Sequence, residues 1–114
     1  MIRIIKSTIS LTELKESAKN SLGSLVKAVV DIERKLMAIE GAMHADEEQI
    51  LLDDGSKQQD LWGINIYPDL PIANRIQFDS MINIRPSQGN LSRSVEDASI
   101  QKEIQTIVNS MITE

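Results

Sequence analysis

The 114-residue chain has no cysteine, one histidine (His44) and one each of tryptophan, tyrosine and phenylalanine. Without cysteine there is no disulfide, no thiolate nucleophile and no zinc site of the cysteine type. A single histidine excludes a multi-histidine metal site. We therefore expect no metal and no cofactor.

Aromatic residues and positive charge are both scarce, since aromatics make up 3% of the chain and the formal net charge is −5. Binding of single-stranded nucleic acid needs aromatic stacking platforms and a basic groove, so we expect no nucleic-acid partner. Long apolar runs are absent too, because no stretch approaches the roughly 18 apolar residues of a membrane span. The first ten residues, MIRIIKSTIS, lack the apolar core of a signal peptide. We expect no membrane association and a cytoplasmic location.

What the chain does have is enough apolar sequence, 41% of its residues, for one hydrophobic core. We therefore predict a single domain over residues 1–114. Capping patterns, hydrophobic periodicity and turn residues divide this domain into strands at 1–6, 25–32, 36–39, 61–67 and 76–85, and helices at 11–22, after Asp46, and after Asp97 to the C-terminus.

One of these assignments has an alternative. The apolar residues of 25–39 fit a helical stripe as well as strand alternation, and the β-branched residues decide for a hairpin. The order of elements then predicts an α+β fold of two layers, in which a mainly antiparallel sheet carries helices on one face and ends in a C-terminal amphipathic helix. The other face of the sheet is expected to be partly open to water.

Two blocks of this sequence, Leu61-Trp62-Gly63-Ile64-Asn65-Ile66-Tyr67-Pro68 and Phe78-Asp79-Ser80-Met81-Ile82-Asn83-Ile84-Arg85-Pro86-Ser87-Gln88-Gly89-Asn90, are distinctive. They resemble a prokaryotic family known only as a domain of unknown function, and the likeness extends over nearly the whole chain. The resemblance implies a single-domain, cytosolic, prokaryotic protein. It implies no activity and no binding residues.

The first candidate site is the loop after the last strand, where Arg85, Ser87, Gln88, Asn90 and Arg93 lie within nine positions. Guanidinium groups, hydroxyls and amides in such a loop are suited to hold a carboxylate or a phosphate. The spacing matches no phosphate-loop or dinucleotide motif. An ordinary connection between strand and helix has the same composition.

The second candidate site is the polar face of the sheet, with Asn65, Asp79, Asn83 and Arg85, to which Asp31 adds another acid. Two carboxylates near an arginine are a minimal set for acid–base chemistry, because neighbouring charges shift their pKa values in different directions. A solvated antiparallel face looks the same.

His44, close to Asp46, is the one candidate for a general base of the usual kind, and an ordinary turn or packing residue is the alternative. The acidic residues of 46–54 do not have calcium-loop spacing, and we expect them to form a solvated helix face. Trp62 alternates with two isoleucines and is expected in the core.

These observations lead to two functional hypotheses, and whether the protein is an enzyme stays open. The first is a small binding or interaction module that forms a homo-oligomer or serves a protein partner. The second is a small enzyme or binding protein for an anionic metabolite, in which Arg85 and Arg93 hold the anion and His44 or Asp79 is the catalytic candidate.

Overall fold

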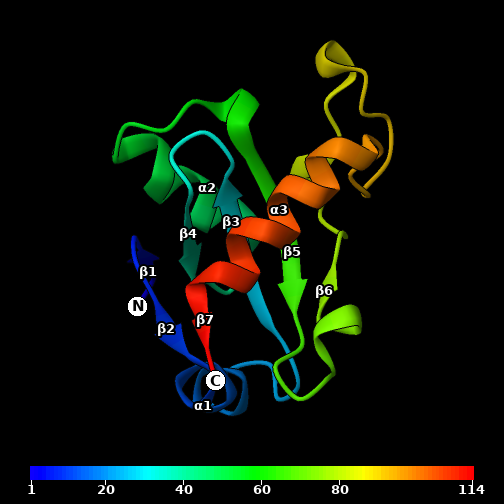
Figure 1. Ribbon diagram of the computed structural model, residues 1–114. Helices are drawn as coiled ribbons and strands as arrows, with labels where there is room; N and C mark the ends of the chain where they lie inside the picture. The colour runs from blue at the N-terminus through cyan, green and yellow to red at the C-terminus, as the bar shows by residue number, and fades with distance from the viewer.

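The computed structural model describes all 114 residues and shows three α-helices around a five-stranded antiparallel sheet of order β1-β4-β3-β5-β6 (Figure 1). The strands are β1 (Arg3–Ile5), β2 (Ile9–Ser10), β3 (Val26–Asp31), β4 (Leu36–Ile39), β5 (Leu61–Ile66), β6 (Ile76–Gln77) and β7 (Ile112–Thr113). The helices are α1 (Leu11–Lys19), α2 (His44–Asp53) and α3 (Ala98–Met111). None of them has the length and apolar character that a membrane crossing requires. β2 and β7 form a separate parallel pair.

The α+β class and the C-terminal helix are thus confirmed, and local capping explains two of the helix starts. Ser10 accepts a hydrogen bond from the Glu13 amide at 3.1 Å and begins α1. Asp97 accepts one from the Ser99 amide at 2.8 Å and begins α3. Each cap satisfies an amide that has no partner within the helix. The hairpin interpretation of 25–39 is also confirmed, because β3 pairs with β4.

One face of the sheet carries the larger part of the core. Alternate residues of the central strands, such as Val30 and Ile64, pack there against Leu14 of α1 and Ile104 of α3. Trp62 belongs to the same cluster and is 2% exposed, as expected for a core tryptophan. In Figure 1, α3 crosses this face in front of β3 and β5. A stripe of apolar residues along α3 is buried by this contact.

The opposite face differs from the expectation of helices on one side only. There Val29 and Ala38 pack against Leu51 of α2, in a second and smaller cluster. α2 therefore lies behind the sheet in Figure 1, on the side away from α3. The reason is the composition of β3 and β4, whose residues are buried on both faces and so need a cover on each.

The strand predicted for 76–85 is wrong beyond Gln77. Only Ile76 and Gln77 pair with β5, and the chain then leaves the sheet for a short 3₁₀ turn at Met81–Asn83. The Asn83 side chain replaces the missing strand as hydrogen-bond partner of β5. It accepts a hydrogen bond from the Gly63 amide at 2.8 Å and donates one to the Gly63 carbonyl at 3.0 Å. The edge of β5 is thereby satisfied without a neighbouring strand.

Candidate functional site

A pocket of about 190 Å³ lies on the α2 side of the sheet, between the start of α2 and the segment that follows β6. It brings together four of the predicted site residues, His44, Asn65, Asp79 and Arg93, although they are far apart in the sequence. The other residues that line it are Lys27, Met43, Ala45, Ser80, Met81 and Ile82. We treat this pocket as the candidate site.

Strand register explains the floor of the pocket. Lys27 of β3 lies directly opposite Asn65 of β5, so both side chains leave the sheet on one face. This is the face on which Val29, two residues further along β3, packs against α2. Neither Lys27 nor Asn65 is fully buried, which leaves a polar floor beside the second apolar cluster.

His44 is the first residue of α2 and is 8% exposed. Its Nε2 lies 2.8 Å from the carbonyl oxygen of Ile64, which only accepts hydrogen bonds, so Nε2 carries the proton. Burial is the main cause that lowers the pKa of His44 below its ordinary value of 6.5, and the nearby Lys27 lowers it further. At neutral pH the ring is therefore neutral, and its Nδ1 is a hydrogen-bond acceptor with no protein partner.

Lys27 is a second polar group without a partner. The ammonium makes no ion pair and no side-chain hydrogen bond, unlike Arg3, Arg34 and Arg93. The carboxyl group of Glu47 is close enough for the charge of Lys27 to affect its pKa. It does not neutralise that charge, because burial raises the pKa of Glu47 to about 9 and leaves the group protonated at pH 7.

The burial of Glu47 corrects the prediction that the acidic residues of 46–54 are all solvated. Glu47 is 0% exposed, and its Oε2 accepts a hydrogen bond from the Gly41 amide at 2.9 Å. Its Oε1 is also buried and has no partner. The spacing holds a signal that our prediction missed, since His44, Glu47 and Leu51 lie at i, i+3 and i+7 on the buried face of α2.

The wall opposite α2 carries an ion pair. Arg93 Nε lies 2.8 Å from Asp79 Oδ1, and both side chains are more than half exposed. The backbone around this pair is held in place, because the Arg93 carbonyl accepts hydrogen bonds from the Ser80 amide and the Asn83 side chain, both at 3.0 Å. A guanidinium has donors beyond the one that Asp79 uses, so Arg93 retains hydrogen-bonding capacity.

The start of α2 adds a positive end to the pocket. Its N-cap residue, Met43, makes no side-chain capping hydrogen bond, in contrast to the N-caps of α1 and α3. The amides of a first helical turn have no partner within the helix, and the helix dipole places partial positive charge there. Met43, His44 and Ala45, the residues at this end, all line the pocket.

Two other predicted residues of the 85–93 loop are used inside the protein. Arg85 is 8% exposed, lies over the Trp62 ring at 4.3 Å and donates hydrogen bonds to the carbonyls of Gln58 and Leu61. Asn90 donates to the carbonyls of residues 83, 92 and 94 and accepts from the amide of residue 96. Both side chains hold the loop in shape, and neither lines the pocket.

The remaining predicted residues also lie outside the pocket. Gln88 accepts a hydrogen bond from Arg85 and donates one to the Gln59 carbonyl, while Ser87 is exposed in a short 3₁₀ turn. Asn83 is committed to Gly63. The structure therefore divides the nine predicted residues into four at the pocket and five elsewhere, and it does not bring Arg85 and Arg93 to one ligand.

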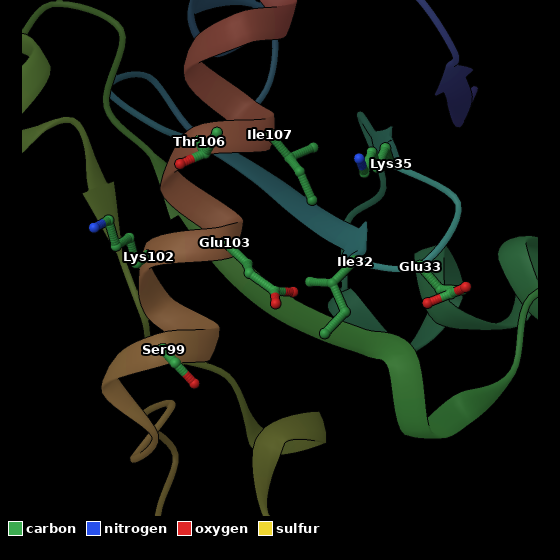
Figure 2. A pocket seen from close by; sticks show the side chains of 8 residues that line it. All are labelled: Ile32, Glu33, Lys35, Ser99, Lys102, Glu103, Thr106 and Ile107. Carbon is green, nitrogen blue, oxygen red and sulfur yellow. The ribbon is translucent and has the colours of Figure 1, made fainter.

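A larger hollow of about 790 Å³ lies between α3 and the turn after β3. Figure 2 shows Glu103 and Ile32 pointing toward one another across it, whereas Lys102 points away. None of the predicted site residues lies there. No three carboxylate or imidazole side chains of the protein come close enough together to hold a metal ion.

Comparison with known proteins adds a family and no activity. No curated protein and no solved structure matches the chain. One family model, described as a protein of unknown function (DUF5674), matches residues 3–111. This match spans the sheet, the three helices and every residue of the pocket. The chain therefore belongs to this family of proteins of unknown function.

Proposed function

We propose that the protein binds a small anion in the pocket at the start of α2. The observation that carries this proposal is Lys27, a partly buried lysine without an ionic partner, which lines the same pocket as a helix N-terminus without a side-chain cap. The ammonium and the first amides of α2 are hydrogen-bond donors, and both favour a negatively charged neighbour. An anion between them satisfies both.

Arg93 supports the same function from the other wall of the pocket. It already holds one carboxylate, Asp79, so its guanidinium is oriented for contact with oxygen ligands. Asp79 also sets the strength of binding, since an anion that approaches Arg93 meets this negative charge. We therefore expect a modest affinity. A dissociation constant in the millimolar range corresponds to a binding free energy of about −4 kcal/mol.

The test is an NMR titration of ¹⁵N-labelled protein with acetate and with inorganic phosphate in a buffer poor in other anions. We expect saturable shifts of the backbone amides of His44 and Ala45. Lys27→Met removes the charge and keeps a side chain of similar length, and it should abolish saturation. Lys19→Met is the matched control, because it changes the net charge equally at an exposed position of α1.

Titrations that leave these amides unmoved, or that move them equally in Lys27→Met, would refute the proposal. The amide spectrum of each variant also reports whether it is folded, so loss of binding is separated from loss of structure.

Self-association remains a prediction. The prediction assumes a sheet face that is open to water. In the structure, α2 and the turn at Met81–Asn83 cover much of that face. Light scattering across a range of concentrations tests it, and a constant monomer mass would end this hypothesis.

A further inference from the structure

We propose that the anion is a short aliphatic monocarboxylate, held by its carboxylate at Lys27 and by its alkyl chain between Met43 and Met81. This inference rests on the proposed function and narrows it to one class of ligand. Three properties of the pocket lead to it, namely its charge, the composition of its rim and its size.

The charge of the pocket matches a single negative charge. Lys27 and Arg93 contribute two positive charges, and Asp79 contributes one negative charge. His44 and the buried Glu47 beside Lys27 are both neutral at pH 7, because burial disfavours their charged forms. The sum over the residues that line the pocket is one positive charge, and Asp46 in the first turn of α2 lies outside this lining. A carboxylate balances this positive charge, whereas a phosphate dianion would leave a negative charge next to Asp79.

The rim of the pocket is apolar. Met43, before α2, and Met81, in the 3₁₀ turn, both line the pocket and are 58% and 66% exposed. Methionine is flexible and polarizable, and it adapts to apolar ligands of varied shape. Ala45 and Ile82 continue this apolar lining. A bare inorganic anion would leave these four side chains unused, while an alkyl chain would cover them.

The size of the pocket limits the length of the ligand. A volume of about 190 Å³ corresponds to roughly six water-sized groups, at the share of about 30 Å³ that each water takes in the liquid. A carboxylate with a chain of a few methylene groups fills this space. Longer chains would extend past the two methionines into water.

The experiment compares acetate, butanoate and inorganic phosphate in the NMR titration described above. Burial of each methylene should strengthen binding about fourfold, so butanoate should bind about fifteenfold more tightly than acetate. The double variant Met43→Ala/Met81→Ala, which shortens both side chains without adding a capping hydroxyl at the start of α2, should lose most of the difference between acetate and butanoate. Leu22→Ala, at an exposed leucine outside the pocket, should leave that difference unchanged.

Each contrary result has a separate meaning. Equal affinities for acetate and butanoate, still dependent on Lys27, would refute the proposal that the ligand carries an alkyl chain. They would leave the proposal of anion binding intact. Tighter binding of phosphate than of butanoate at about pH 8, where phosphate is a dianion, would overturn the charge argument. Absence of binding by all three compounds would refute the proposed function itself.

Discussion

Replacement of Glu47 by glutamine is the most informative perturbation that the structure suggests. Glu47 is fully buried against the Gly41 amide, and burial raises the pKa of its carboxyl group from the ordinary 4.5 to about 9. Lys27 acts in the opposite direction but is outweighed by burial, and Asp46 adds to the rise. Glutamine keeps a carbonyl oxygen for the Gly41 amide and cannot ionise.

The magnitude follows from the difference between the folded and the unfolded chain. At pH 7 the unfolded chain has released the proton of Glu47, whereas the folded protein retains it. Folding must then take up a proton, at a cost of about 1.4 kcal/mol for each pH unit above the unfolded pKa, or about 3 kcal/mol at pH 7. The folded pKa is the higher one, so the contribution of Glu47 to stability is greatest below about pH 4.5 and declines as the pH rises toward 9.

The assay is urea denaturation of the wild type and Glu47→Gln between about pH 5 and pH 8, a range that lies between the two pKa values. The variant should gain stability relative to the wild type by about 1.4 kcal/mol per pH unit, or about 4 kcal/mol between the two ends of this range. Glutamine adds a buried N–H that needs a partner, but this cost does not depend on pH. Glu16→Gln, at an exposed glutamate, is the control for the general effect of charge. A difference that stays constant across this pH range would show that Glu47 is ionised in the folded protein and would refute the reasoning.

Three further changes test the pocket and its support. Asp79→Asn frees Arg93 from its ion pair and should strengthen acetate binding severalfold in the NMR titration; weaker binding would show that Asp79 helps to hold the ligand. Asn83→Ala leaves the amide and carbonyl of Gly63 without partners and should lower the free energy of unfolding by about 3 kcal/mol, and a loss of less than about 1 kcal/mol would mean that water replaces the side chain. Because burial holds the pKa of His44 below 6.5, the ring stays neutral near neutral pH, so acetate affinity should not change between about pH 8 and about pH 7, and an affinity that rises as the pH falls across this range would show that the ring gains charge there.

The parts of the fold that could be predicted are those that nearby residues determine. The Ser10 and Asp97 caps begin helices where the sequence places them, because a capping hydrogen bond spans only a few residues. The strand predicted for 76–85 failed for a tertiary reason. The apolar residues of this segment do alternate. However, the Ser80 hydroxyl accepts a hydrogen bond from the Ile82 amide, and the Asn83 side chain, in place of a neighbouring strand, accepts one from the Gly63 amide.

The candidate site was predicted in part. His44, Asn65, Asp79 and Arg93 were chosen for their chemistry, but nothing local in the sequence shows that they meet. Lys27 was missed, although a lone charge among the apolar residues of 25–30 was a usable signal. Its position opposite Asn65 depends on the pairing of β3 with β5, which no short stretch of sequence specifies.

The two distinctive blocks of the sequence meet at the edge of β5, where most of the strand has no neighbouring strand to pair with. Trp62 lies beneath Arg85, Gly63 is bonded to Asn83, and Asn65 donates to the Asp79 carbonyl at 3.3 Å, so the second block is attached to the first mainly through side chains. A regular strand at this edge would send alternate side chains to the two faces of the sheet. Attachment through side chains leaves the backbone free to turn, and that turn brings the second block to the pocket wall on the α2 side. The departure from the predicted strand therefore also explains how the pocket forms.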